Sequence, residues 1–361
     1  MASKETAAAS TEGVVRAVLR ERRGCRVRAK AGKIMVSQGS CADGRRQRGS
    51  RPFGACSGCL WLLRSAREDD VPELPEVEHT ARALAHWLTG QRIEGAEADP
   101  TRMLRGQSPR AFARMLKGRT LDRVERRGKA MLLTFDADAG LLSHLGMTGR
   151  WLRRLPGEPP PRHSRARIYL PQGVVLHNDD PRMFGRLLVA PASTLPALPD
   201  LLALGPDPLR DGVDASALGQ AFARTTRPVK VALMDPTVIA GVGNIQATEA
   251  LFRAGVHPAR PAHGLAPDEV AAVAAGIEAS ITHTLASLAA QPEVAYLGSG
   301  LAPENPFLVY DRAGTPCPRC STTLDKMTLG GRTSAYCPRC QPRCQPRRAR
   351  RRRATSPSAG P

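Results

Sequence analysis

Four cysteines near the C-terminus stand at a spacing that suits a metal ion. They form two pairs, Cys317-Pro-Arg-Cys320 and Cys337-Pro-Arg-Cys340, separated by sixteen residues. Two such knuckles can place four thiolates at about 2.3 Å around one tetrahedral zinc ion. Because four sulfurs fill the coordination sphere, we expect one structural zinc ion and no catalytic role for it. A pair of disulfides is the alternative, but the chain gives no other sign of an oxidising compartment.

A second group of candidate residues lies in short motifs that combine polar or charged side chains with glycine or proline. The motifs are Pro72-Glu-Leu-Pro-Glu-Val-Glu78, Arg127-Gly-Lys129, His144-Leu-Gly-Met-Thr-Gly149, Asp180-Pro-Arg-Met-Phe-Gly185 and Gly241-Val-Gly-Asn-Ile245. In the last of these, glycines let the backbone approach a ligand, and the N-terminus of the helix that follows could bind a phosphate. Asn244 adds an amide donor and could cap that helix.

Hydrophobic periodicity predicts the elements that must position these motifs. A helix is expected over Thr80–Leu88, where apolar residues follow a helical spacing. Strand-like runs separated by turn residues then predict an antiparallel sheet unit; they are Ala130–Phe135, Leu141–Leu145, Arg167–Leu170, Val174–His177 and Arg186–Val189.

After Pro191 the pattern becomes helical. The expected helices are Ala215–Arg224, Val229–Met234, Ile245–Ala254 and Pro267–Leu288. Between the two cysteine knuckles, Thr322–Leu329 and Thr333–Tyr336 predict the two strands of a zinc hairpin.

The charge of the chain indicates a polyanionic partner. Its 361 residues include 53 Lys and Arg against 33 acids, which gives a net charge of +20 and a pI near 10.6. Much of the excess lies at the ends, with 15 basic against 7 acidic residues in 1–70, and seven Arg and no acid in 341–361. No run of 18 apolar residues occurs, so we do not expect a membrane span.

Taken together and in this order, the motifs and the zinc knuckles closely resemble those of bacterial formamidopyrimidine-DNA glycosylases, whose family also contains endonuclease VIII. The resemblance extends over about 72–341. It implies an α+β protein with an N-terminal antiparallel β-sandwich, a helical helix–two-turn–helix domain and a C-terminal zinc hairpin. The expected parts are a disordered or mis-assigned extension at 1–70, the sandwich at 71–205, the helical domain at 206–305, the zinc finger at 306–341 and a disordered basic tail at 342–361.

The resemblance implies a bifunctional DNA glycosylase and AP lyase of base excision repair. Such an enzyme removes oxidised purines, namely 8-oxoguanine and formamidopyrimidines, and nicks the strand by β,δ-elimination. Pro72 would be the nucleophile, because a terminal proline is a secondary amine whose adduct with the sugar C1′ stays a cationic iminium. Glu73 would be the general acid or base. Lys129 would serve β-elimination, and Arg332 would grip phosphates and serve δ-elimination.

The resemblance also implies a set of DNA contacts. Met147, Arg182 and Phe184 match the wedge residues that fill the stack after a base is flipped out. Lys230, Asn244 and His163 match residues near the DNA. Glu76 and Glu249 match family carboxylates, to which we assign supporting roles. The expected partner is double-stranded DNA with an oxidised base or an abasic site, bound by a monomer in the bacterial cytoplasm near the nucleoid.

Pro72 is preceded by 71 residues, so its nitrogen is an amide in the chain as written. Val71 suggests an explanation, because a GTG codon is read as methionine when it starts a bacterial message. Initiation there, followed by removal of methionine, would expose Pro72. If Pro72 stays internal, the alternative is a non-enzymatic protein that binds damaged DNA.

Three departures from the family pattern bear on which lesion is removed. Met183 stands where a second basic residue is usual, Thr225 stands where a lysine is usual, and Ala289–Pro306 replaces the loop that covers flipped 8-oxoguanine. Oxidised purines remain the first expectation because of Pro72-Glu-Leu-Pro-Glu76. Oxidised pyrimidines, as removed by endonuclease VIII, are the alternative.

Overall fold

The computed structural model describes residues 29–30, 33–34, 71–290 and 305–343. The chain divides into two units, 1–63 and 64–361. Within the described part of the first unit, strand β1 (Ala29–Lys30) pairs with β2 (Lys33–Ile34). The predictions for the 1–70 extension, for the loop Ala289–Pro306 and for the 342–361 tail fall largely outside the described residues. The remaining paragraphs concern the second unit.

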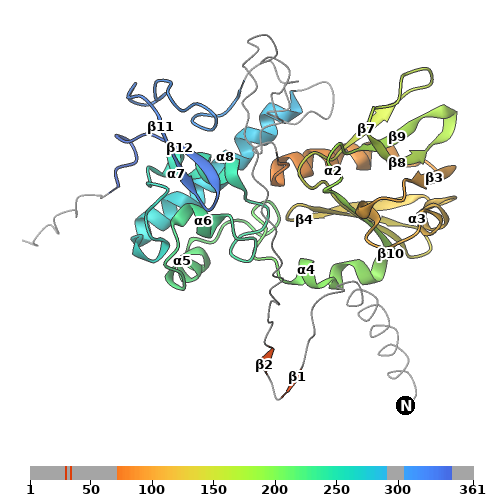
Figure 1. Cartoon of the computed structure of the whole chain (residues 1–361), viewed down its shortest axis with the longest axis horizontal. Coiled ribbons are helices and arrows are strands. Elements are labelled where there is room, and N and C mark those ends of the chain that lie inside the picture. The colour runs from red at the N-terminus through yellow and green to blue at the C-terminus, as the bar shows by residue number, and fades with distance from the viewer. Residues whose placement is uncertain (1–28, 31–32, 35–70, 291–304, 344–361) are drawn as a thin grey trace, which may run out of the picture. The chain divides into compact units, whose positions relative to one another are not determined.

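The N-terminal part of this unit consists of two four-stranded antiparallel sheets (Figure 1). One sheet has the order β10-β6-β5-β4 and the other β3-β8-β9-β7. The strands are β3 (Gly95–Ala98), β4 (Leu121–Arg127), β5 (Ala130–Phe135), β6 (Ala139–His144), β7 (Arg150–Arg154), β8 (Ser164–Tyr169), β9 (Val175–Asp179) and β10 (Arg186–Pro191). The predicted α+β fold with an N-terminal antiparallel sandwich is therefore confirmed.

The inner strands β5 and β6 are buried on both faces. Met131, Leu133 and Phe135 of β5 belong to the main core of the sandwich. Ala130 and Leu132, which point the other way because side chains alternate along a strand, join a second cluster with residues of the segment that follows β10. That segment contains the short helix α4 (Pro199–Leu202). Burial on both faces explains why β5 reads as a nearly continuous apolar run.

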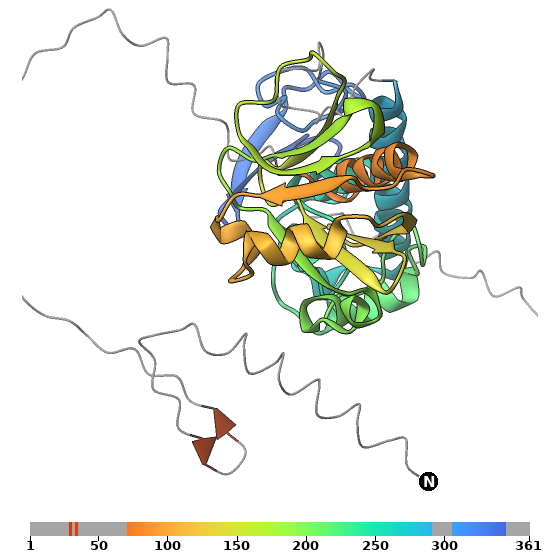
Figure 2. The same ribbon diagram turned by 90° about the vertical axis from the view of Figure 1, so that its right-hand side faces the viewer.

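Two helices flank the sheets. Helix α2 (Leu74–Leu88) packs against β4 and β7, and α3 (Pro109–Leu116) packs against β3 and β10 (Figure 2). Helix α2 begins six residues earlier than the predicted Thr80, because Pro75 is tolerated in a first turn and Glu76 accepts a hydrogen bond from the backbone N–H of Glu73 at 3.1 Å.

The helical part contains α5 (Ala215–Ala223), α6 (Val229–Leu233), α7 (Asn244–Ala254) and α8 (Pro267–Ala289). Helices α7 and α8 pack closely, since a Cβ on Gly276 would stand only 2.5 Å from the carbonyl oxygen of Ala250. Within the described part of the chain, α8 is the one helix long and apolar enough to cross a membrane by length and composition. Much of it is buried in the protein, where Val273, Ile277 and Ile281 belong to the helical core.

The C-terminal part is a two-stranded hairpin of β11 (Asp325–Leu329) and β12 (Arg332–Tyr336). Gly330 and Gly331 form its turn, and both have positive φ, as two-residue hairpin turns of this kind require. Strand β12 contacts α7. The predicted zinc hairpin is confirmed, with Arg332 as the first residue of β12.

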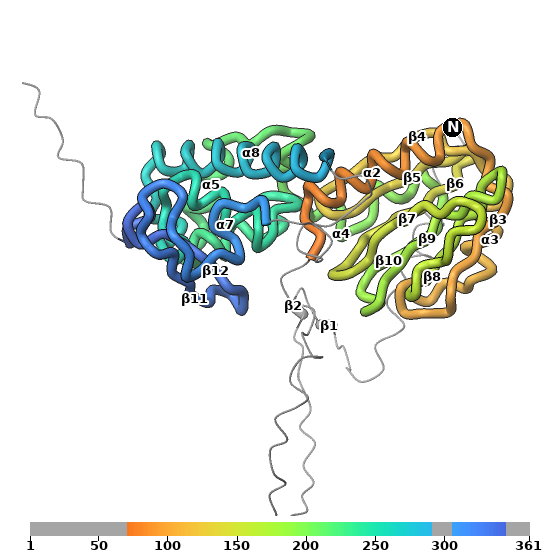
Figure 3. The backbone as a smooth tube through the Cα atoms, turned by 90° about the horizontal axis from the view of Figure 1, so that it is seen from above, coloured from red at the N-terminus to blue at the C-terminus, as the bar shows by residue number. Residues whose placement is uncertain are grey.

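Helix α2 connects the sheets to the helices. Its first residue, Leu74, belongs to the helical core, and its N–H donates to the carbonyl oxygen of Gly241 at 3.1 Å. From there α2 (orange in Figure 3) passes along α8 and then along the sheets. Pro72 and Glu73, which precede Leu74, therefore lie where the two parts meet.

Candidate active site

Glu73 places its carboxylate on the N-terminus of helix α7. One oxygen, Oε1, accepts from the N–H of Ile245 at 2.8 Å, and the other, Oε2, accepts from those of Gly243 and Gln246 at 3.0 Å each. The side chain is almost fully buried, and the positive end of the helix dipole stabilises its charge. The structure differs here from the prediction, because Gly243 is the N-cap, Asn244 is the first helical residue, and a carboxylate occupies the position expected for a phosphate.

Lys129 reaches the same point from the sandwich. A Cβ built on Gly243 would stand 2.4 Å from Glu73 Oε1 and 2.7 Å from Lys129 Nζ. These distances are shorter than any van der Waals contact, so glycine is required for the two side chains to meet here. The geometry brings together two of the four predicted catalytic residues from segments that are 56 positions apart in the sequence.

The turn that carries Lys129 is held by a buried ion pair. Asp207 is fully buried and accepts two hydrogen bonds from Arg126, at 2.6 and 2.8 Å. Its Oδ2 also accepts from the backbone N–H of Gly128 at 2.8 Å. Arg126 is the penultimate residue of β4, and Asp207 lies in the segment between α4 and α5. This pair therefore fixes the turn of Lys129 relative to the segment that leads into the helical part.

Pro72 is buried at the same junction. Its sequence motif also carries a second carboxylate, that of Glu76. Glu76 is almost fully buried, and one of its oxygens, Oε1, has no hydrogen-bond partner among the described residues. Burial, followed by the nearby charge of Glu73, raises the pKa of Glu76 to about 7. Glu76 can therefore hold a proton at neutral pH close to the residue that follows Pro72.

The predicted wedge residues lie on two turns that one aspartate joins. Asp180 is fully buried; its Oδ1 accepts from Thr148 Oγ1 at 2.6 Å and from the N–H of Arg182 at 3.2 Å, and its Oδ2 accepts from the N–H of Gly185 at 2.9 Å. Met147 precedes Thr148, and Phe184 precedes Gly185, so both turns are fixed by one carboxylate.

The two turns also touch through their backbones. Gly146 has a φ of 66°, and a Cβ there would stand 2.4 Å from the carbonyl carbon of Phe184. Met147 is half-buried, whereas Phe184 is 42% exposed and is one of the few large apolar side chains to protrude. The guanidinium carbon of Arg182 lies 4.9 Å from the centroid of the Phe184 ring. The structure thus brings all three predicted wedge residues together.

A basic cavity of about 430 Å³ lies beside these groups. Lys129, His144 and Phe184 line it, and its further charged lining residues are Arg105, Arg127, Arg186 and Asp200. Sequence reasoning did not single out His144, Arg105 or Arg186. His144 could have been found from its place at the start of the glycine-bearing motif that carries Met147, but nothing local marks the two arginines.

His144 is a neutral hydrogen-bond donor in this cavity. Burial, followed by the charges of Lys129, Arg186 and Arg105, lowers its pKa to about 4. Its Nδ1 lies 3.0 Å from the N–H of Gly146, which donates to it, so the proton of the neutral ring is on Nε2. A neutral imidazole N–H surrounded by cations is suited to donate to a phosphate oxygen.

Two of the residues expected near DNA have structural contacts. Lys230 is fully buried, and its Nζ donates to Asn244 Oδ1 at 2.6 Å, Ser334 Oγ at 2.5 Å and the carbonyl oxygen of Thr333 at 3.0 Å. Lys230 therefore joins α6, α7 and β12, and its ammonium is not at the surface. By orienting Asn244 and the backbone next to Arg332, it can position two residues that were expected to contact DNA.

His163 and Arg332 are half-buried. The backbone N–H of His163 donates to Asp179 Oδ1 at 2.8 Å, which fixes the loop before β8. Arg332 stands at the tip of the zinc hairpin, directly after the glycine turn. The structure places Arg332 on a different element from Glu73 and Lys129.

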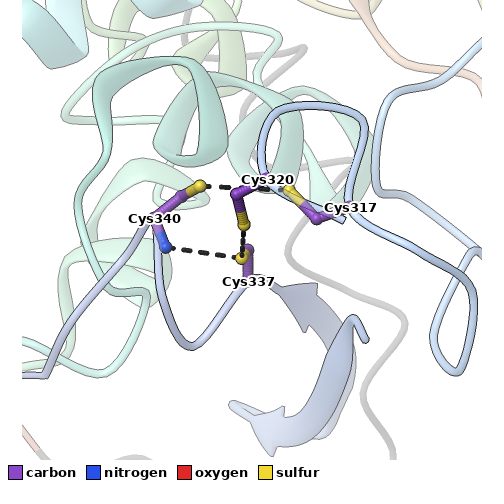
Figure 4. Close-up of side chains that lie close together, drawn as sticks. All are labelled: Cys317, Cys320, Cys337 and Cys340. Atoms are coloured by element: carbon purple, nitrogen blue, oxygen red, sulfur yellow. Dashed lines mark hydrogen bonds between the residues drawn. The ribbon is translucent and has the colours of Figure 1, made fainter. Parts of the chain in front are cut away.

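The four predicted ligands form a compact sulfur cluster (Figure 4). All four Sγ atoms lie within 4.8 Å of one another, with 3.9 Å between Cys317 and Cys340 and 3.5 Å between Cys320 and Cys337. Sulfurs around a tetrahedral zinc ion with bonds of about 2.3 Å lie about 3.8 Å apart. The donor set therefore fits a structural zinc ion.

Glu249 attaches the cysteine unit to helix α7. Its Oε1 accepts from the N–H groups of Val309 and Tyr310, at 2.9 and 3.0 Å, and its Oε2 from that of Leu308 at 3.1 Å. Three N–H groups on one buried carboxylate make a strong anchor. The supporting role predicted for Glu249 is thus a contact between α7 and the segment that leads into the knuckles.

Comparison with known protein families gives three matches along the chain. Residues 71–187 match the formamidopyrimidine-DNA glycosylase N-terminal domain, residues 204–291 match the formamidopyrimidine-DNA glycosylase H2TH domain, and residues 314–343 match the zinc finger found in FPG and IleRS. These three matches follow the order that the motifs predicted.

Similar curated proteins and solved structures carry the same name. The formamidopyrimidine-DNA glycosylase of Methylococcus capsulatus is 40% identical over 282 residues, which cover 75% of this chain and 100% of that protein. That of Gloeobacter violaceus is 39% identical over 286 residues, which cover 75% and 98%. The structure of Lactococcus lactis Fpg in complex with DNA containing an abasic site has a TM-score of 0.67 at 28% identity and covers 75% of this chain and 99% of that chain. The Thermus thermophilus MutM (FPG) protein has a TM-score of 0.64 at 34% identity, over 75% and 98%.

Proposed function

Because the chain belongs to the formamidopyrimidine-DNA glycosylase family, a family of DNA glycosylases of base excision repair, we propose that it excises oxidised purines and then nicks the DNA at the resulting abasic site. The observation that supports this best is that Glu73, the residue after Pro72, meets Lys129 at Gly243. The substrate class, the lyase step and the role of each residue are parts of the proposal.

Pro72 is the proposed nucleophile. Its nitrogen lone pair attacks the sugar C1′, the bond from C1′ to the damaged base breaks, and the base leaves with a proton. The nitrogen loses its one proton, and the C1′–O4′ bond of the sugar ring then breaks as O4′ takes up a proton. The ring-opened product is an iminium ion that stays cationic, because its nitrogen has no further proton to lose. This cation then makes the neighbouring C2′ proton acidic, so that its removal expels the 3′-phosphate in β-elimination.

The neighbouring side chains supply the proton transfers and the charge. Glu73, fixed by three N–H groups of α7, lies next to the nucleophile, and the raised pKa of Glu76 allows that residue to act as a proton store behind it. Lys129 would assist β-elimination, and Arg332 would hold a phosphate and assist the second, δ-elimination. His144 would donate to a phosphate in the basic cavity.

The wedge residues would admit the lesion to this site. A base inside a duplex is reached only after it is flipped out, and the vacated space must be filled. Phe184 protrudes from a turn fixed by Asp180, and Met147 lies on the adjoining turn. His163 and Asn244 would contact the strands, and Lys230 would act through Asn244.

The proposal requires that the active form begin at Pro72. In the 361-residue chain this nitrogen is an amide and has no nucleophilic lone pair. We propose that initiation at codon 71 followed by removal of methionine generates the active form. The amide nitrogen of Pro72 in the longer chain also supports the second candidate function. If residue 72 stays internal, the protein binds damaged DNA without catalysis.

Several finer points belong to the proposal as well. One zinc ion per chain is expected from one four-cysteine cluster among the described residues. Oxidised pyrimidines are the alternative substrate class, because Met183, Thr225 and Ala289–Pro306 depart from the family pattern. A monomer located in the bacterial cytoplasm near the nucleoid stays a prediction, as do the domain boundaries given above.

Borohydride trapping tests the mechanism. Protein that begins at Pro72 should become covalently attached to duplex DNA holding 8-oxoguanine or an abasic site, since borohydride reduces an iminium to a stable amine. The intact 361-residue protein should bind the DNA without being trapped. Efficient trapping of that longer protein would show that another amine, with Lys129 the first suspect, is the nucleophile. A parallel duplex with an oxidised pyrimidine distinguishes the two substrate classes.

A further inference from the structure

Arg102 contacts the wedge turn although it comes from a distant part of the chain. It is the first residue of a 3₁₀-helix, η1 (Arg102–Leu104), which lies between β3 and α3. Its Nε donates to the carbonyl oxygen of Met183 at 2.9 Å, and its Nη2 donates to the carbonyl oxygen of Arg182. Its guanidinium carbon lies 4.7 Å from the centroid of the Phe184 ring. One side chain thus contacts all three residues of the turn.

The turn needs such support. Met183 has a φ of 55°, a left-handed conformation that is strained for a residue with a side chain. Asp180 holds the N–H groups on either side, at Arg182 and Gly185, but it cannot bind the carbonyl groups. Arg102 binds two of those carbonyl groups. The backbone that presents Phe184 is therefore fixed by an acceptor, Asp180, and a donor, Arg102, from two distant segments of the chain.

The contact with the ring also bears on orientation. Phe184 is 42% exposed, so little packing within the described residues determines its rotamer. The guanidinium groups of Arg102 and Arg182 both lie within 5 Å of the ring centroid, and neither forms an ion pair with a carboxylate in the described part of the chain. Cation–π attraction favours the rotamer in which the ring lies against Arg102.

We propose that Arg102 is a positioning residue for the wedge, which holds Phe184 in the orientation that enters the base stack. This inference rests on the proposed function, because only a protein that flips a base needs the wedge. It assigns Arg102 an action through Phe184 and no contact with the reacting atoms. Loss of Arg102 should therefore weaken binding to duplex DNA and leave binding to single-stranded DNA unchanged, since a single strand has no paired stack to fill.

The test uses a duplex with a tetrahydrofuran abasic analogue next to 2-aminopurine, whose fluorescence rises when it is unstacked. This analogue cannot be cleaved, so the readout requires no chemistry. We expect Arg102→Ala to reduce the fluorescence rise and to weaken duplex binding about tenfold, which corresponds to the loss of about 1.4 kcal/mol. Affinity for a single-stranded tetrahydrofuran oligonucleotide should stay unchanged. Arg102→Lys, which keeps the charge without the planar fork, should give an intermediate result.

Two further variants serve as controls. Arg110→Ala removes an exposed arginine on the adjacent helix α3. Among the described residues, Arg110 forms no ion pair or side-chain hydrogen bond with the turn, so this variant should keep the full fluorescence rise. In a Phe184→Ala background, Arg102→Ala should have little additional effect, because residues that act through one contact are not additive. If circular dichroism shows that Arg102→Ala is not folded, the comparison of Arg102→Lys with the wild type is the test.

The possible results are distinct. A wild-type fluorescence rise and affinity in Arg102→Ala would overturn the inference, as would equal losses on single and double strands. A full additional loss in the Phe184→Ala background would also overturn it. If the wild-type protein unstacks 2-aminopurine but is never trapped by borohydride, the lyase proposal fails while the role of Arg102 is still measured.

Discussion

The backbone N–H of Gly243 donates to the carboxylate of Glu73 across 3.0 Å, and no side chain at residue 243 could fit beside that contact. The pair joins the first turn of α2 to the first turn of α7, across 170 positions of sequence. Both the proposed catalytic geometry and the junction of the sheets with the helices depend on it.

Gly243→Ala should therefore damage the site directly. The new methyl group would meet Glu73 and Lys129, so we expect a loss of stability of about 1–3 kcal/mol and at least about a 100-fold loss in single-turnover cleavage. Gly264→Ala is the matched control, because nothing lies within 4 Å of its new Cβ. Equal behaviour of the two variants would contradict the geometry.

Glu73→Gln should affect base removal more than cleavage of a preformed abasic site, because only base removal requires help in expelling the base. The amide keeps one acceptor oxygen but turns an NH₂ donor toward the N–H groups of α7, so we also expect a stability loss of about 1–3 kcal/mol. Single-turnover rates on an 8-oxoguanine duplex and on an abasic duplex measure the difference. Equal losses on both substrates would remove the general-acid role.

Glu76→Gln should change how stability depends on pH. In the folded wild type the pKa of Glu76 is raised from 4.5 to about 7, so the native state binds a proton more tightly than the unfolded state. The stability of the wild type should fall by up to about 3 kcal/mol as pH rises from about 4.5 to 7. Glu76→Gln should not show this fall, because glutamine cannot ionise.

Urea midpoints between pH 5 and 8 test this prediction. The wild type should lose stability relative to Glu76→Gln as pH increases, while the exposed Glu94→Gln should follow the wild type. Parallel curves for all three proteins would mean that Glu76 does not carry the proton.

His144 should remain neutral in the free protein throughout the physiological range. Its lowered pKa predicts that its imidazole proton resonance in NMR does not titrate between pH 5.5 and 8. His144→Leu should weaken duplex binding by about tenfold through loss of a donor to phosphate, whereas His144→Gln, which retains an N–H donor, should keep most of the affinity. Unchanged affinity in His144→Leu would exclude the phosphate contact.

Cys317→Ser should lower zinc content, thermal stability and DNA affinity together, because metal binding contributes folding free energy in so small a unit. Metal analysis should give about one zinc ion per wild-type chain. Cys344→Ser, outside both knuckles, should retain the metal. A zinc-free preparation with full activity would contradict the structural role.

The sequence predicts the interior of this fold better than its margins. The inner strands β5, β6, β8 and β9 and the helices α5 to α8 were predicted to within a few residues, because burial makes their apolar pattern continuous. The strands β3, β4 and β7 were missed, and each lies at an edge of its sheet; the fourth edge strand, β10, was predicted from its apolar run Arg186–Val189. An edge strand has one partner and faces solvent, so charged residues such as those of β4, Leu-Asp-Arg-Val-Glu-Arg-Arg, hide the alternation.

The site shows the same limit for a different reason. The cysteine ligands and the wedge residues were found because they lie in short motifs. The cap that Glu73 provides for α7 and the support that Arg102 provides for Phe184 join residues 172 and about 80 positions apart, and no local pattern records such contacts. Lys230 was expected near DNA from the family resemblance of its helix, but three acceptors from two other elements allow its burial.

The buried ammonium of Lys230 has a consequence for how this sequence can evolve. A mutation that removes the zinc hairpin, or the acceptors at Ser334 and Asn244, would leave a cation inside the protein with too few acceptors. Such a change could persist only with a compensating substitution at residue 230. Lineages that carry an apolar residue at this position should therefore also differ at residues 244 and 334, and the three positions should be inherited as one covarying set.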